Sequence, residues 1–246
     1  MVAFKRVSLV IPCYNEEDSI LNLTNRLNPA VADLEKDYEI ELVFVDDGSK
    51  DKTYQLLNEH YGNKKDVKII RHEQNYNLGA ALRTAFRSST GEVIVPLDCD
   101  CTFPPEKVRN LLELLDDDID IVNASPYHPL GKLDNVPFYR RILSKTISET
   151  YRTLLGRKDI YTYTGIFRAY RKNVLDNIKF ESDGFLCCAE ILSYAILKGY
   201  KIKEYPSTLY TRQYGKSSIK LFRVIMSHLK FVVKLSYIKL LRRKKI

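Results

Sequence analysis

The chain has 246 residues, of which 45% are apolar and 11% aromatic, and its formal net charge is +8. Normal apolar content without low-complexity runs excludes an intrinsically disordered chain. Ten glycines, nine prolines and an odd number of cysteines, five, exclude a collagen-like chain or a disulfide-stapled miniprotein. A sizeable hydrophobic core is therefore expected.

The first hundred residues alternate between two kinds of segment. Short β-branched runs predict buried strands over 7–11, 42–45, 67–70 and 93–97. Apolar residues spaced three or four apart predict helices over 16–34 and 77–88, and a further helix is expected over 51–61. Such alternation predicts an α/β fold with right-handed crossovers and an open, mostly parallel sheet flanked by helices.

Polar and acidic side chains follow three of the predicted strands. These segments are Pro12–Glu16, Asp46–Ser49 and Asp98–Asp100. In an open parallel sheet, ligands bind beyond the carboxyl ends of the strands. We therefore expect the three segments to converge on one ligand site.

Asp98 and Asp100 stand one residue apart at the end of the fourth strand, in the sequence Asp-Cys-Asp. Two carboxylates so placed can share a hard cation, Mg²⁺ or Mn²⁺, that keeps further coordination positions for a diphosphate. The alternative is a turn or helix-capping role, because a Pro-Pro-Glu helix start follows closely. An isolated pair of this kind is a weak signal, so the surrounding sequence must decide between a metal site and a structural role.

That context is a set of four motifs in a fixed order. They are VIPCYNEE at 10–17, VDDGSKDKT at 45–53, NLGAA at 77–81, and DCD at 98–100 followed by PPE at 104–106. The chain resembles the family-2 glycosyltransferases over about residues 5–215, and within them the polyprenyl- or dolichyl-phosphate sugar transferases. Segments 164–168, 183–192, 199–206 and 212–218 extend the resemblance. It implies a GT-A domain over 1–216, a nucleotide-sugar donor and a Mg²⁺ or Mn²⁺ cofactor.

The resemblance also implies roles for individual positions. Asp98 and Asp100 would bind the metal and, with Cys99, the ribose-diphosphate, although Thr102 stands where relatives often carry Gln. Asp46 would accept a hydrogen bond from the base. The remaining implied donor-binding residues are Pro12, Tyr14, Glu16, Arg141, Arg212 and Lys216. Arg212 and Lys216 belong to a loop that closes over the diphosphate in relatives, where cations stabilise the charge of the leaving group.

The acceptor determines whether the reaction needs a base. A sugar hydroxyl is a weak nucleophile and requires a carboxylate, for which Glu190, or else Asp183, is the candidate. A phosphate monoester is already anionic at pH 7 and needs none. The leading hypothesis is an inverting transferase with Asp100, Glu190 and Arg212 in its catalytic set and a polyprenyl-phosphate acceptor. A glycan acceptor, or a non-catalytic nucleotide-binding protein, are the alternatives.

The basic charge lies in the last part of the chain. Ten lysines and arginines and no acidic residue fall between 216 and 246, which leaves 29 bases against 31 acids in the rest. Apolar residues spaced as on one helical face predict an amphipathic helix over 217–246; they are Ile219, Phe222, Ile225, Met226, Leu229, Val232 and Val233. Such a helix is typical of binding to an anionic membrane surface, and packing on the catalytic domain is the alternative.

Other features set the expected location. No apolar run approaches the roughly 18–20 residues of a membrane span, and the N-terminus lacks the cleavage site of a signal peptide. The cysteines are interpreted as reduced thiols without zinc-site spacing. We therefore expect a cytoplasmic protein, peripheral on the cytosolic face of a membrane. No aromatic–basic pattern accompanies the basic tail, so nucleic-acid binding is not expected.

Overall fold

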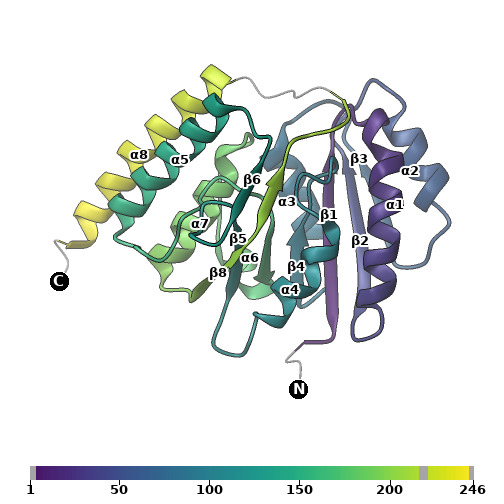
Figure 1. Ribbon diagram of the computed structural model, residues 1–246, viewed down its shortest axis with the longest axis horizontal. Helices are drawn as coiled ribbons and strands as arrows, with labels where there is room; N and C mark the ends of the chain where they lie inside the picture. The colour runs from purple at the N-terminus through teal and green to yellow at the C-terminus, as the bar shows by residue number, and fades with distance from the viewer. Residues whose placement is uncertain (1–3, 216–220, 244–246) are drawn as a thin grey trace.

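The computed structural model describes residues 4–215 and 221–243. A seven-stranded sheet runs through the middle of the molecule, in the order β3-β2-β1-β4-β7-β5-β8 (Figure 1). Its strands are β1 (Arg6–Cys13), β2 (Glu39–Asp46), β3 (Val67–Arg71), β4 (Val93–Pro96), β5 (Ile121–Ser125), β7 (Arg168–Arg171) and β8 (Ile202–Pro206). Only β7 runs antiparallel to its neighbours. The predicted mostly parallel sheet flanked by helices is confirmed.

Two smaller strands and nine helical segments complete the described part of the chain. The strands β6 (Lys132–Asp134) and β9 (Thr208–Tyr210) form a separate parallel pair. The helices are α1 (Glu17–Leu34), α2 (Thr53–Tyr61), α3 (Leu78–Ser88), the 3₁₀ turn η1 (Pro105–Lys107), α4 (Val108–Glu113), α5 (Phe138–Leu155), α6 (Lys172–Asn177), α7 (Leu186–Lys198) and α8 (Leu221–Arg243). The seven elements predicted in the first hundred residues are all present, within about three residues at each end.

The sheet separates two hydrophobic clusters. Successive side chains of a strand point to opposite faces, so Leu9 and Ile11 of β1 pack with α1, α2 and α4, whereas Val10 packs with α3 and α7. Because both faces are covered, the strand sequences are continuously apolar. This explains why short apolar runs predicted strands correctly.

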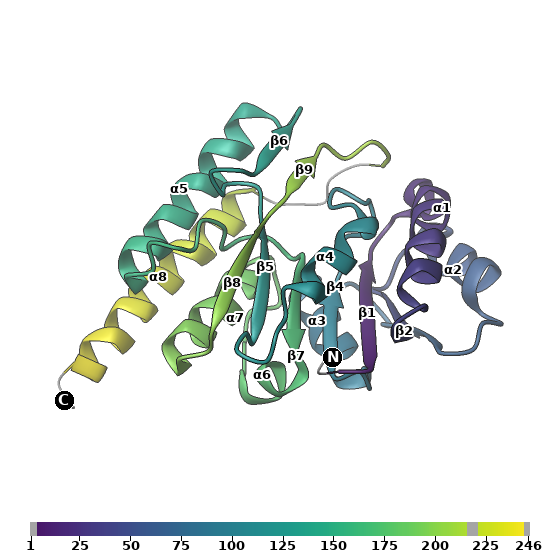
Figure 2. The same ribbon diagram turned by 60° about the horizontal axis from the view of Figure 1, so that its bottom comes forward.

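Helices α5 and α8 lie side by side at one end of the molecule, outside α7 (Figures 1 and 2). His228, Phe231 and Leu235 of α8 are buried, and Phe231 and Leu235 join the cluster formed by α3 and α7. The predicted C-terminal helix is therefore present from Leu221. Residues 216–220, where we expected it to begin, lie outside the described residues.

Candidate active site

A pocket of about 810 Å³ opens beyond the carboxyl ends of β1, β2 and β4. The sheet order explains its position, because β2, β1 and β4 are adjacent and parallel and so end at one edge. Seven residues implied by the resemblance line it: Pro12, Tyr14, Glu16, Asp98, Cys99, Asp100 and Arg212. The expected convergence of the strand ends is thus observed.

The turn after β4 directs both acidic side chains into the pocket. The N–H of Cys101 donates to the carbonyl of Asp98 at 3.1 Å, and Cys101 adopts a left-handed φ of 55°. The Thr102 N–H donates to Asp100 Oδ1 at 3.1 Å, and its hydroxyl to Asp98 Oδ2 at 3.3 Å. Burial and the charge of Asp100 raise the pKa of Asp98 well above its usual value. Thr102, at the position that departs from the family, therefore orients the acidic pair.

This acidic pair fits a divalent cation. Carboxylate oxygens are the ligands that Mg²⁺ and Mn²⁺ prefer, and a cation would relieve the repulsion between Asp98 and Asp100. Across residues 4–215 and 221–243, no group of three or more His, Cys, Asp or Glu side chains forms a cage for a metal. A cation at the pair would thus take its other ligands from water and a bound diphosphate, as Mg²⁺ commonly does.

Arg212 lies beside the acidic pair, although it is distant in sequence. Its Nε is 2.7 Å from Asp100 Oδ2, and its Nη2 and Nη1 are 2.7 and 3.1 Å from the two carboxylate oxygens of Glu16. Burial raises the pKa of Glu16, while the contact with Arg212 opposes that rise. The guanidinium thus places a positive charge beside the acidic pair. Lys216, its predicted companion, lies outside the described residues.

The two aspartates at the end of β2, Asp46 and Asp47, face different surroundings. Asp46 is fully buried; it accepts from the N–H of Ser49 at 3.1 Å and pairs with Arg71 Nε at 3.1 Å. Of the two, Asp47 lines the pocket. Asp47 accepts from the Tyr76 N–H at 2.9 Å and lies 2.7 Å from Nδ1 of His72. The structure therefore brings Asp47 to the described lining of the pocket, and not Asp46, the residue implied to bind the base.

Two other predicted residues lie away from the pocket wall. Arg141 is exposed on α5, and its guanidinium lies 5.2 Å from the centroid of the Phe138 ring. Glu190 is buried on α7, where Oε2 accepts from the N–H groups of Glu181 and Ser182 at 3.2 and 2.9 Å. Neither belongs to the described lining of the pocket.

Sequence analysis assigned no donor-binding role to two parts of the pocket wall. One is the loop that contributes Ser182, Gly184 and Phe185; the other is the first part of α8, which contributes Arg223, Val224 and Ser227. Segment 183–192 extends the family resemblance, but it did not indicate that Gly184 and Phe185 line the donor pocket. Only the packing of α7 and α8 against the rest of the domain brings them to the strand ends.

Known proteins are similar to this chain in sequence and in fold. The family model "Glycosyl transferase family 2" matches residues 8–179. A dolichol-phosphate mannosyltransferase of Pyrococcus furiosus is 34% identical over 94% of this chain and 63% of its own length. A polyprenol monophosphomannose synthase of Mycolicibacterium smegmatis is 31% identical over 87% of this chain and 81% of its own. An undecaprenyl-phosphate 4-deoxy-4-formamido-L-arabinose transferase of Klebsiella pneumoniae is 34% identical, over 70% of this chain and 50% of its own.

Solved structures agree on the fold. Glucosyl-3-phosphoglycerate synthase of Mycobacterium tuberculosis, crystallised with Mn²⁺, UDP and glucosyl-3-phosphoglycerate, has a TM-score of 0.69 at 18% identity, over 94% of this chain and 78% of its own. A crystal of the same enzyme with Mg²⁺ and UDP gives 0.70. The fold, the order of the motifs and the extent of the family match lead to one conclusion: the chain belongs to glycosyl transferase family 2.

Proposed function

We propose that this chain is an inverting glycosyltransferase that moves a sugar from a UDP- or GDP-sugar to a polyprenyl or dolichyl phosphate. The observation that carries the proposal is the pocket, in which Asp98, Asp100 and Arg212 meet at the carboxyl ends of the strands. Acidic oxygens for a cation and a guanidinium for phosphate are the groups that a nucleotide diphosphate requires. The names of the relatives support a lipid-phosphate acceptor.

In this proposal the pocket residues have different roles in binding the donor. Asp98 and Asp100 would hold Mg²⁺ or Mn²⁺, which when bound neutralises charge on the diphosphate. Arg212 would exchange part of its pairing with Glu16 and Asp100 for phosphate oxygens as charge develops on the leaving group. Pro12, Tyr14, Cys99 and Asp47 would form the wall around the nucleoside and ribose.

The reaction in this proposal is a single displacement. An oxygen of the acceptor phosphate attacks the anomeric carbon from the face opposite the diphosphate. The new carbon–oxygen bond forms as the bond to the diphosphate breaks, and the nucleoside diphosphate leaves with the electron pair. Because a phosphate monoester is largely ionised at pH 7, no protein base is needed. The engagement of Glu190 with two backbone N–H groups favours this acceptor over a sugar hydroxyl.

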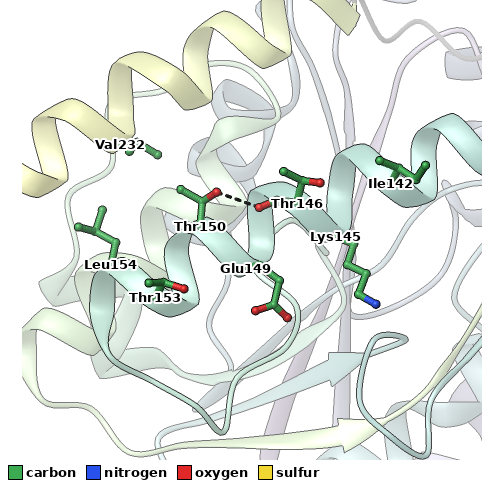
Figure 3. A pocket seen from close by; sticks show the side chains of 8 residues that line it. All are labelled: Ile142, Lys145, Thr146, Glu149, Thr150, Thr153, Leu154 and Val232. Atoms are coloured by element: carbon green, nitrogen blue, oxygen red, sulfur yellow. Dashed lines mark hydrogen bonds between the residues drawn. The ribbon is translucent and has the colours of Figure 1, made fainter.

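The outer face of α8 supports attachment to a membrane. Six apolar side chains form a solvent-exposed stripe along it: Phe222, Met226, Leu229, Val233, Tyr237 and Leu240. Lysines at 230 and 234 are exposed nearby, and α8 contains no acidic residue. A groove of about 730 Å³ runs along α5 and is bordered by Val232 of α8 (Figure 3). An apolar stripe with adjacent cations is typical of helices in an anionic membrane interface.

A peripheral position on the cytosolic face belongs to the same proposal. None of the helices in the described residues combines the length and the hydrophobicity that crossing a bilayer requires. The five cysteines are unpaired thiols, which supports a reducing compartment. Attachment through α8 would place the first turns of that helix, and with them the pocket, next to a lipid-linked acceptor.

Two assays test the donor and the acceptor separately. We expect UDP or GDP with Mn²⁺ to raise the melting temperature, because a ligand at 100 times its Kd stabilises the folded state by about 2.7 kcal/mol. We then expect sugar transfer to a polyprenyl phosphate and none to a free alcohol of the same lipid. Nucleotide binding without transfer to any acceptor would favour the non-catalytic alternative. The absence of binding by either nucleotide with Mn²⁺ would contradict the donor site.

A further inference from the structure

Residues 181–185 form a loop before α7 that closes one side of the pocket. Ser182, Gly184 and Phe185 line the pocket together with residues that come from the strand ends. The loop has no strand or helix of its own to hold it in place. Its position therefore depends on contacts with its neighbours, and these contacts come from three different helices.

The first set of contacts joins the loop to α3. The Gly79 N–H donates to the carbonyl of Asp183 at 2.5 Å, and Arg83 Nη1 donates to the carbonyl of Ser182 at 3.1 Å. A Cβ at Gly79 would lie 2.0 Å from Ser182 O, so only glycine permits this approach. Arg83 also pairs with the carboxylate of Asp183. These contacts hold the carbonyl groups of the loop.

Glu190 holds the N–H groups. From the second turn of α7, its Oε2 accepts from the N–H of Glu181 at 3.2 Å and of Ser182 at 2.9 Å. The side chain is 2% exposed. A charged acceptor shared by two backbone donors forms strong hydrogen bonds where water is excluded. On the other side of the loop, Glu181 pairs with Lys234 of α8 at 2.8 Å, but that pair is exposed and contributes little.

We propose that Glu190 is a positioning residue, whose carboxylate fixes the 181–185 loop as a wall of the donor pocket, and that it does not act as a general base. The proposal rests on the proposed function for the identity of the ligand. It differs from the base hypothesis in what the side chain must provide. A positioning residue needs an acceptor oxygen, whereas a general base needs a group that takes up a proton.

Three variants separate the two roles. Glu190→Gln keeps a carbonyl oxygen that can accept from both N–H groups but removes the ionisable group. Glu190→Ala removes both. Ser193→Ala is the control, because Ser193 is equally buried on α7 and its hydroxyl has no hydrogen-bond partner within the described residues. Each variant is prepared as the full chain and compared by thermal melting.

The first measurement is amide hydrogen exchange at residues 181 and 182 in the ligand-free protein. Glu190→Ala is expected to speed exchange there about tenfold or more, since losing one hydrogen bond to a charged group has at least that effect. Glu190→Gln and Ser193→Ala are expected to retain most of the protection. Equal protection in the alanine variant and in the unmodified chain would overturn the proposal, whether or not the chain transfers a sugar.

The second measurement is steady-state transfer from the donor sugar to a polyprenyl phosphate. We expect Glu190→Ala to raise the KM for the donor about tenfold or more with a smaller fall in kcat, and Glu190→Gln to restore both to within about threefold. The pH profile of kcat/KM should be the same in the glutamine variant. A kcat in Glu190→Gln about 100-fold lower or worse, with amide protection intact, would instead identify a base and overturn the proposal.

Discussion

Asp98 combines a cost for folding with a proposed role in binding the donor and its cation. Its carboxylate lies beside that of Asp100 and accepts a long hydrogen bond from the Thr102 hydroxyl, at 3.3 Å. Burial and the neighbouring negative charge both disfavour its ionised form. Arg212 offsets the negative charge of Asp100 directly, through an ion pair of 2.7 Å. A bound cation would stabilise the ionised form of Asp98 in the same way. This is the physical reason for proposing a cation at the acidic pair.

Asp98→Asn should therefore separate stability from function. We expect the metal-free variant to melt at the same or a higher temperature than the unmodified chain, because a buried like-charge repulsion is removed. The Mn²⁺-dependent stabilisation by nucleotide should be lost, and transfer should fall about 100-fold or more. Melting curves with and without Mn²⁺ and nucleotide measure both effects.

Asp117→Asn is the matched control, because Asp117 is exposed in the turn after α4. It should leave the melting temperature and the response to Mn²⁺ unchanged. A large loss of stability in metal-free Asp98→Asn would show that Asp98 supports the fold, and would contradict the assignment of its carboxylate to a ligand.

At the scale of a single element, α8 shows the limits of a periodic pattern. The predicted stripe included Phe222, Met226, Leu229 and Val233, which are all exposed. The buried face is formed instead by His228, Phe231 and Leu235. The helix is thus apolar on more than one side, and which side packs on α5 and α7 follows from the shape of those helices and not from the spacing alone.

The packing of α8 depends on a histidine that stays neutral. His228 is 4% exposed, and its Nδ1 lies 2.8 Å from the hydroxyl of Tyr151 on α5. Burial lowers the pKa of His228 to about 4, from 6.5 in the unfolded chain. Between these two pH values the unfolded state binds the extra proton, so the stability of the fold rises with pH there and is lost on acidification.

Acidification from pH 7.5 to pH 5 should lower the free energy of unfolding by about 2 kcal/mol through His228, because proton binding is linked to unfolding. Urea unfolding at the two pH values measures the loss. His228→Gln keeps a hydrogen-bonding group but cannot be protonated, and should show a smaller change. If the two proteins lose the same stability, His228 is not the group that links acidity to unfolding.

At the scale of the whole molecule, α8 connects the candidate donor pocket with a candidate membrane surface. The pocket lies at the carboxyl ends of β1, β2 and β4, whereas α5 and α8 form the far end of the molecule, away from α1 and α2 (Figures 1 and 2). Helix α8 belongs to both regions. Its first turns supply Arg223, Val224 and Ser227 to the pocket, and the rest carries the exposed apolar stripe. Binding of α8 to a membrane would therefore also fix part of the pocket wall.

Charge introduced into the stripe should weaken membrane binding. Phe222 and Val233 are 78% and 70% exposed. The double variant Phe222→Glu and Val233→Glu should bind vesicles of anionic phospholipid about tenfold more weakly or worse, because it removes apolar contact area and adds repulsion. Co-sedimentation with vesicles gives the partition coefficient.

Leu21→Glu provides the comparison, because Leu21 is 61% exposed on α1 at the other end of the molecule. It should bind vesicles as the unmodified chain does. Equal binding by the double variant and the unmodified chain would exclude the α8 stripe as the attachment surface, and the lipid-linked acceptor would then have to reach the pocket another way.

The sequence by itself determined the fold class and the position of the pocket. Strands buried on both faces are recognisable as short apolar runs, and parallel strands necessarily end at a common edge, where Asp98 and Asp100 were expected. The order of the motifs was sufficient to identify the family, because each motif is a local run of residues. These features depend on neighbours in sequence, and so a sequence can specify them.

Only the tertiary structure decided which side chains meet. Arg212 and Glu16 are 196 residues apart in sequence, yet their side chains are paired. Asp47 and not Asp46 faces the pocket, because adjacent residues at a strand end point to opposite sides. Glu190 lies on α7 but bonds to the loop before it, since the packing of α7 fixes its direction. Such contacts join distant segments, and no local pattern encodes the angle at which those segments pack.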